Sequence, residues 1–174
     1  MLRMPLFLFC ALLFGQVWAS EAVQSKAVYG YLERAVLVDK PLMLKAKLDT
    51  GANSASLYAK RIRHIDIKGK PFVRFVVPTK TGDIPFTVPY LGEVSIKARS
   101  GEVGGVRIKN PFIKRPVVSM RVQLGHEVRM IRVNLANRKR FAYPLLLGRE
   151  ALIAFHAVVD PGQKFTLNTT VAVH

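Results

Sequence analysis

Residues 44–54 read LKAKLDTGANS, and this stretch decides the fold expected for the chain. The run from Leu42 to Leu48 predicts a β-strand that delivers Asp49 into a tight turn at its end. Gly51 allows a close backbone approach that any Cβ would block. Thr50 adds a hydroxyl group that can hydrogen-bond across a twofold axis. The sequence therefore predicts a carboxylate presented at the tip of a loop.

The Asp-Thr-Gly turn by itself is compatible with three kinds of site. Asp49 can cap its own backbone, as turn aspartates often do. A calcium loop is a second interpretation, although Gly51 stands where such a loop needs an oxygen-bearing side chain. The third is an aspartic peptidase, in which two such loops bring two carboxylates to about 3 Å, so that they share one proton. One carboxylate then acts as base toward a water while the other polarises the scissile carbonyl.

The rest of the chain has the pattern of an all-β domain, because short apolar or alternating runs are separated by Gly, Pro and Asn turns. The clearest pair is 116–124 and 127–135, two period-2 runs joined by a Gly-containing turn, which predicts an antiparallel hairpin. One short helix is expected at 149–155, and a turn at Pro161-Gly162. Further strands are predicted at 27–38, 42–48, 57–67, 72–77, 145–147, 156–160 and 164–173.

The first nineteen residues have the layout of a secretory signal peptide. A short basic start is followed by an apolar run at 6–15, which is too short to span a bilayer, and Val17-Trp18-Ala19 offers small residues where a signal peptidase cleaves. We therefore expect a periplasmic or secreted domain at 20–174, with an uncleaved anchor as the alternative. Cys10 is the only cysteine, so that domain has neither a disulfide nor a thiol nucleophile.

The chain is strongly basic, with 27 Lys and Arg against 11 Asp and Glu and a net charge of +16. Such an excess attracts anionic partners, which for an exported protein are an anionic envelope surface or an acidic polypeptide. A nucleic acid partner is not expected, since no nucleic-acid-binding motif accompanies the charge. A basic surface that serves only solubility remains the alternative.

Two further segments accompany the Asp-Thr-Gly turn. Residues 144–149 read PLLLGR and residues 159–162 read VDPG. Together with LDTGA at 48–52, and in this order, they resemble the bacterial retropepsin-like aspartic peptidase family historically labelled ATP-dependent zinc proteases. The resemblance covers about residues 27–168.

The resemblance implies an acid-protease fold, a closed β-barrel with one short helix after the Leu-Leu-Gly element. It also implies that Asp49 is the catalytic aspartate and that Thr50, Gly51 and Ala52 complete its active-site loop. Behind this loop the family threads a supporting element, which here matches Leu146, Leu147, Gly148 and Arg149.

A catalytic pair requires two chains. The sequence holds a single Asp-Thr-Gly, and the nearest second candidate, Asp160-Pro161-Gly162, lacks the hydroxyl and the N–H that Pro161 removes. We therefore expect a homodimer. By analogy with viral relatives, flexible hairpins cover the paired loops, and residues 78–92 are the segment expected to do so.

One position departs from the viral pattern. Viral retropepsins carry an acidic residue two positions after the Gly of the loop, where it pairs with the Arg of the Gly-Arg element. Asn53 stands at this position, so the sequence predicts no charged partner there for Arg149.

No cofactor or metal is expected. The four histidines are widely separated, and His126-Glu127 begins like a zinc-peptidase helix but has Met130 where the second His should stand. The chain also lacks a phosphate-binding loop.

The leading hypothesis is thus an aspartic endopeptidase in which Asp49 of each copy activates one water. Its substrate is a polypeptide, and both the charge and the association of family members with glutamate-ligase-like proteins favour acidic or glutamate-rich sequences. The alternative is a non-catalytic binding module of the same fold, which uses its basic surface to hold an anionic polymer or protein.

Overall fold

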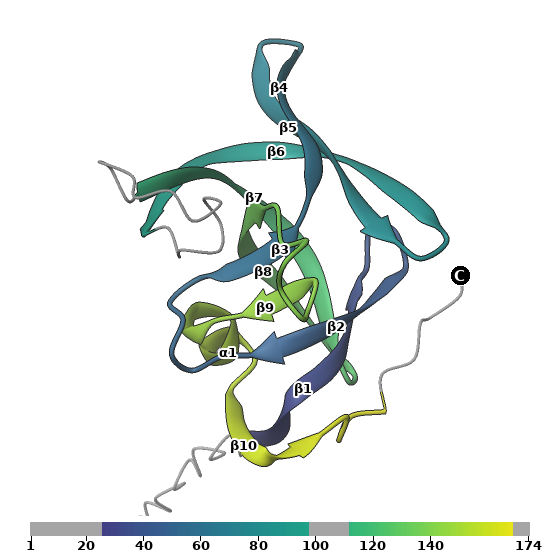
Figure 1. Ribbon diagram of the computed structural model, residues 1–174, viewed down its shortest axis with the longest axis vertical. Coiled ribbons are helices and arrows are strands. Elements are labelled where there is room, and N and C mark those ends of the chain that lie inside the picture. The colour runs from purple at the N-terminus through teal and green to yellow at the C-terminus, as the bar shows by residue number, and fades with distance from the viewer. Residues whose placement is uncertain (1–25, 98–111, 169–174) are drawn as a thin grey trace, which may run out of the picture.

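The computed structural model describes residues 26–97 and 112–168. In this part of the chain the structure is nearly all β, with one short helix, which confirms the predicted fold class (Figure 1). The elements are β1 (Ala27–Leu37), β2 (Leu42–Leu48), β3 (Ala55–Tyr58), β4 (Lys60–Ile67), β5 (Lys70–Thr79), β6 (Gly82–Lys97), β7 (Phe112–Leu124), β8 (Glu127–Ala136), β9 (Leu145–Leu147), α1 (Arg149–Ala154) and β10 (Ala157–Lys164).

Six of the strands form a closed ring of pairings. β1 pairs with β2, β2 pairs in parallel with β9, and β9 pairs with β3. β3 then pairs in parallel with β8, β8 pairs with β7, and β7 returns to β1. As a result β9 lies between the strand that precedes the Asp-Thr-Gly turn and the strand that follows it (Figure 1).

The core lies inside this ring and follows the period of the strands. The predicted β7–β8 hairpin is confirmed, with Val118, Met120 and Val122 buried on β7 against Ile131 and Val133 on β8. Alternate residues of a strand point to opposite faces, so the apolar set of each strand turns inward. α1 packs on the same core through Ala151 and Leu152.

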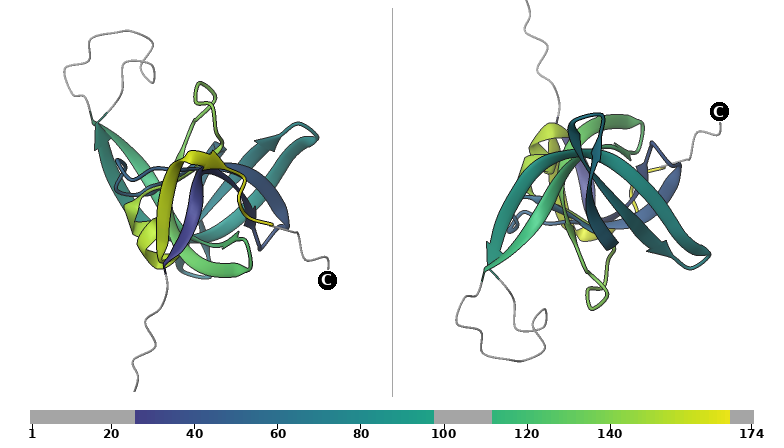
Figure 2. Two further views of the ribbon diagram at one scale, coloured as in Figure 1. Left: turned by 90° about the horizontal axis from the view of Figure 1, so that it is seen from below. Right: turned by 90° about the horizontal axis from the view of Figure 1, so that it is seen from above.

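β4, β5 and β6 extend the sheet beyond the ring as an arm, whose β4–β5 end projects from the body (Figures 1 and 2). The arm has its own apolar contact, since the rings of Phe75 and Phe86 stack with centroids 5.4 Å apart. β4 is its most exposed strand, and this is where Lys60, Arg61 and Arg63 lie. Their charged groups can therefore remain in water.

Two sequence predictions of strand boundaries were wrong. Residues 57–67 are two strands, because the chain changes partners at Ala59, from β8 and β9 to β5. Pro161-Gly162 does not separate two strands, because β10 runs through it to Lys164. β10 is an edge strand, where a proline that cannot donate a hydrogen bond is tolerated, and its pairing with β1 is irregular at this point.

Other predictions fall outside the described residues: the signal peptide at 1–19 and the part of the 164–173 strand after 168. Residues 78–92, expected to cover the site, form the β5–β6 turn and the first part of β6. Of the helical residues that the structure describes, none belongs to a helix long and apolar enough to cross a membrane.

Candidate active site

β2 and β9 together fix the position of Asp49. They pair in parallel, with Leu48 opposite Leu147, and both leucines are buried. The ladder continues into the loop, since Asp49 N donates to Leu147 O at 2.9 Å. Two buried strands therefore hold the backbone of the aspartate, as the sequence predicted for a strand ending at this residue.

Gly148 lies directly behind the active-site loop. A Cβ at this position would stand 2.6 Å from Ser54 O, 2.8 Å from Asn53 O and 2.9 Å from Ala52 O. These are backbone atoms that a side chain cannot push aside, so only glycine fits. The next two amides complete the contact, since Arg149 N donates to Ala52 O at 2.9 Å and Glu150 N to Asn53 O at 3.1 Å.

The carboxylate of Asp49 stays accessible at the tip of this support. Its side chain is 20% exposed, Gly51 N donates to Oδ1 at 3.1 Å, and Lys47 Nζ lies 3.0 Å from Oδ2. Burial is the largest single influence on its pKa and raises it. The hydrogen bond and charge of Lys47, with the Gly51 and Ala52 amides, outweigh burial, so the pKa of Asp49 lies below its usual value. One chain by itself therefore presents an ionised carboxylate.

Lys47 was not among the site residues expected from the sequence, although a signal for it was present. It stands two residues before Asp49 along β2, and residues two apart in a strand share a face. A lysine at this spacing can therefore reach the carboxylate.

Asn53 makes two polar contacts in place of the ion pair of the viral pattern, one with Arg149 and one with Glu150. Arg149 Nη2 donates to Asn53 Oδ1 at 3.1 Å, and Asn53 Nδ2 donates to Glu150 Oε1 at 3.2 Å. Arg149 Nη1 also donates to Thr50 O at 3.2 Å. An amide can accept from a cation and donate to an anion together, which a carboxylate cannot do. The Gly-Arg element is thus tied to the loop without an acidic residue at 53.

Thr50 lies on the exposed side of the loop. It borders a shallow, largely apolar cavity of about 410 Å³ between the loop, α1 and the start of β10, with Arg149, Leu152, Ile153 and Val158 also lining it. Ile153 is 72% exposed. Large apolar side chains are therefore left uncovered beside the loop.

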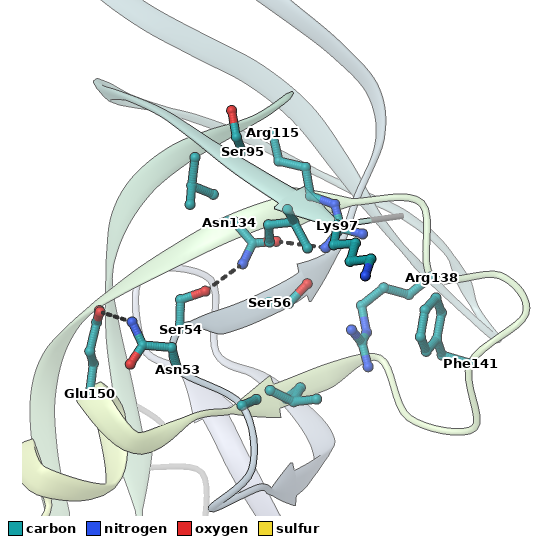
Figure 3. A pocket seen from close by; sticks show the side chains of 14 residues that line it. Asn53, Ser54, Ser56, Ser95, Lys97, Arg115, Asn134, Arg138, Phe141 and Glu150 are labelled. Atoms are coloured by element: carbon teal, nitrogen blue, oxygen red, sulfur yellow. Dashed lines mark hydrogen bonds between the residues drawn. The ribbon is translucent and has the colours of Figure 1, made fainter. Parts of the chain in front are cut away.

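A second cavity of about 430 Å³ borders the other side of the loop, and we call it the polar cavity because charged and amide side chains gather in it (Figure 3). Ala52, Asn53 and Ser54 form one wall, and the end of β6, from Val94 to Lys97, forms another. None of residues 78–92 lines it. The remaining polar lining residues are Ser56, Arg115, Asn134, Arg138 and Glu150. The sequence predicted no role for Arg115, Asn134 or Arg138.

No metal centre is evident among the side chains that the structure describes, since none of their His, Cys, Asp and Glu residues form a group of three or more. Asp160, the second candidate aspartate, accepts hydrogen bonds from Gly162 N and Gln163 Nε2, each at 2.8 Å, on the edge strand β10. Its hydrogen bonds therefore stay within three residues of it on β10.

Known proteins resemble this chain in sequence and in structure. Two proteins named "Probable alpha-L-glutamate ligase", from Shewanella halifaxensis and Shewanella pealeana, are each 30% identical over 128 residues. The match covers 71% of this chain and 26% of theirs, so the chain spans about a quarter of the length of these curated relatives. The crystal structure of Lpg0085, a protein of unknown function from Legionella pneumophila subsp. pneumophila str. Philadelphia 1, is 53% identical with a TM-score of 0.69. That match covers 82% of this chain and 98% of the Legionella chain.

A family model described as "Retropepsin-like aspartic endopeptidase RimB" matches residues 28–170, which include the loop, the Leu-Leu-Gly element and the whole lining of the polar cavity. Because the match extends over most of its length, the chain belongs to the RimB-like family of retropepsin-like aspartic endopeptidases.

Proposed function

We propose that this protein is an aspartic endopeptidase whose active site forms between two copies of the chain, with Asp49 from each. One observation carries the proposal: Asp49 is fixed by buried β-structure through Leu147 and Gly148, while its carboxylate remains accessible. A turn aspartate that only capped its own backbone would need no such support from β9, a distant part of the chain. Arg149, at the start of α1, adds a hydrogen bond to Thr50 O across 99 residues.

The surface around Thr50 supports a second copy as the partner. The exposed side of the loop continues into the apolar residues Ile153 and Val158. Covering such surface favours association because apolar area leaves water. A twofold axis through this region would place Thr50 and Asp49 of both copies beside each other. The site is incomplete without the second copy, since one chain supplies one catalytic loop.

In the proposed reaction the two carboxyl groups share one proton, because two ionised carboxylates at close range repel each other. The ionised group removes a proton from a water, whose oxygen bonds to the carbonyl carbon of the peptide. The protonated group donates its proton to the carbonyl oxygen. When the C–N bond breaks, the nitrogen takes the proton that the first group removed from the water. One hydroxyl of the tetrahedral intermediate gives its proton to the other carboxylate as the new carboxyl group forms, so both products leave and the dyad again holds one proton.

The proposed setting is the periplasm or the cell exterior, which the signal-like first nineteen residues support. The proposed substrate is a polypeptide rich in acidic residues. A net charge of +16 favours such substrates, and so do relatives named as glutamate ligases, in which a region similar to this chain is part of a larger protein.

A non-catalytic binding module is the second candidate function. It is favoured by the ion pair between Lys47 and Asp49, in which the lysine charge already balances the charge of the ionised carboxylate within a single chain. The basic arm around β4 favours it as well. In this case anionic polypeptides bind in a salt-sensitive manner and are not cut.

The two functions are separated by a cleavage assay on residues 20–174 and on its Asp49→Asn variant. An unfolded protein mixture that contains acidic sequences is incubated with each protein at several pH values, and new peptide ends are identified by mass spectrometry. Cleavage by the native protein alone supports the peptidase. Salt-sensitive binding of acidic chains by both proteins, without any cleavage, supports the binding module.

A further inference from the structure

The polar cavity beside the active-site loop contains a buried hydroxyl group that nothing satisfies. Ser56, on β3, is 4% exposed and lines the cavity. Among the residues that the structure describes, its Oγ has no hydrogen-bond partner. Buried polar groups in proteins are nearly always paired, because an unmade hydrogen bond costs free energy. A buried hydroxyl without a partner in the wall of a cavity therefore indicates that a ligand binds there.

Two buried guanidinium groups face the same cavity. Arg115, on β7, is 8% exposed, and Arg138, in the loop before β9, is 6% exposed. In Figure 3 they approach from different sides, with the Ser56 hydroxyl between them and Lys97 nearby. Low exposure strengthens their attraction for an entering anion, because less water screens the charge.

Protein contacts hold both arginines in place. Arg115 Nη1 donates to Asn134 Oδ1 at 3.2 Å, and Asn134 Nδ2 in turn donates to Ala55 O at 2.6 Å. Arg138 Nε donates to Tyr143 O at 3.2 Å, and its guanidinium lies 4.4 Å from the centre of the Phe141 ring. Side chains fixed in this way lose little conformational freedom when a ligand binds, which is the property of a preformed subsite.

The lining carries an excess of positive charge. Its three cations are Lys97, Arg115 and Arg138, against one carboxylate, that of Glu150. Glu150 accepts the hydrogen bond from Asn53 and so belongs to the support of the active-site loop. The cavity therefore offers an anion a positively charged part of its wall, although more of the wall is apolar than polar.

We propose that this cavity is a carboxylate-binding subsite of the enzyme, with Arg115, Arg138 and Ser56 as its recognition residues. The proposal rests on the proposed endopeptidase function and assigns specificity to these three side chains. Ala52, Asn53 and Ser54 directly follow the catalytic turn and form one wall, so the occupant belongs to the polypeptide close to the scissile bond. The anion that a polypeptide carries is a carboxylate, whose two oxygens match the planar donor fork of arginine.

The carboxylate has two sources, an acidic side chain or the C-terminus of the substrate. The test uses short peptides of one backbone sequence that carry a single Glu at successive positions, each matched by the same peptide with Gln. Every peptide is made with a free and with an amidated C-terminus. The native dimer is expected to favour Glu over Gln by about 10- to 100-fold in kcat/KM at one position relative to the cut, the range for a charged hydrogen bond. A preference that follows the free C-terminus instead identifies the terminal carboxylate as the occupant.

Variants connect the preference to the named residues. Arg138→Gln and Ser56→Ala are expected to reduce the Glu-to-Gln preference, with a larger fall in kcat/KM on the Glu peptide than on the Gln peptide. Arg63→Gln, which removes the same charge from the exposed strand β4, is the matched control and should keep the preference. Ser56→Ala should also leave the protein at least as stable, since it deletes an unsatisfied buried hydroxyl.

A binding measurement separates failure of this subsite from failure of the proposed function. The rise in melting temperature with each peptide is measured for the native protein, for Arg138→Gln and for Arg63→Gln. If no peptide is cut but carboxylate peptides stabilise the native protein and not Arg138→Gln, the subsite stands and the peptidase does not. If peptides are cut with equal efficiency for Glu and Gln at every position and for both C-termini, the subsite proposal is overturned and the peptidase stands. Equal stabilisation of the native protein by Glu and Gln peptides, whether amidated or free at the C-terminus, overturns it as well.

Discussion

Lys47 Nζ lies 3.0 Å from Asp49 Oδ2, so a cation from β2 pairs with the candidate catalytic carboxylate. The pair is partly exposed and contributes little to stability by itself, as exposed ion pairs generally do. Its effect on protonation matters more, since a general base must be ionised at the working pH. The lysine favours the ionised form of Asp49 and thereby sets the acid limit of the proposed reaction.

Lys47→Gln is expected to move the acid limb of the pH–rate profile to higher pH. Without the lysine charge and hydrogen bond the pKa of Asp49 rises, so less of the ionised base is present at a given acidic pH. The measurement is kcat/KM against pH for the native protein and for two variants. Lys45→Gln, two residues earlier on the same strand, is the control. An acid limb that does not move in Lys47→Gln contradicts this role.

The lowered pKa of Asp49 also predicts how stability depends on pH. A carboxyl group whose pKa is lower in the folded than in the unfolded state adds stability above the unfolded value, here 3.8. That stability disappears as the pH falls through the folded value. At dilutions where single chains predominate, the melting temperature of the native protein should therefore fall, relative to that of Asp49→Asn, when the pH is lowered from about 5 to about 3. Parallel curves for the two proteins in this range contradict the assigned direction.

Gly148→Ala should disrupt the support of the active-site loop. Its Cβ would meet three backbone carbonyl oxygens at 2.6–2.9 Å, and relief requires the loop to move away from β9. We expect a loss of at least about 2–3 kcal/mol in the free energy of unfolding, measured by urea denaturation. Gly69→Asn is the control, since a Cβ there meets nothing within 4 Å and asparagine tolerates its positive φ of 74°. Equal losses for the two variants would show that the close approach at Gly148 is unimportant.

Asn53→Asp should fail to strengthen the contact with Arg149, although it restores the acidic residue of the viral pattern. The new carboxylate would face Glu150 Oε1, to which the Asn53 amide now donates at 3.2 Å. We expect the free energy of unfolding at neutral pH to fall by about 0.5–1 kcal/mol. The double variant Asn53→Asp/Glu150→Gln should recover this loss, because the glutamine amide can donate to the aspartate. A gain in stability in the single variant speaks against the bridging role of Asn53.

The features of this structure that can be predicted from the sequence are those determined by residues close together in the chain. Alternation predicts the β7–β8 hairpin, and the sharp boundary at Leu48 predicts the position of Asp49. The contact between Gly148 and the active-site loop could be expected only through the family resemblance, because it joins segments about a hundred residues apart.

The polar cavity could not be predicted, because the strand order brings its residues together. Ser56, Arg115 and Asn134 come from β3, β7 and β8, and each one alone looks like an ordinary polar residue of a strand. Glu33, on β1, makes another contact that could not be predicted from the sequence. Its carboxylate is buried and accepts from Thr166 N at 3.0 Å and from Leu167 N at 3.3 Å, a contact across more than 130 residues.

The central claim is that catalysis needs Asp49 from two chains, and mixing the native protein with Asp49→Asn tests it most directly. The two forms are mixed in equal amounts, allowed to exchange subunits, and checked for mixed dimers by native mass spectrometry. Random pairing leaves about a quarter of the dimers with two native chains, so the account predicts about half the activity per native chain of an unmixed sample at the same total chain concentration. Activity per native chain that stays unchanged on mixing would contradict the shared active site, since each chain would then act alone.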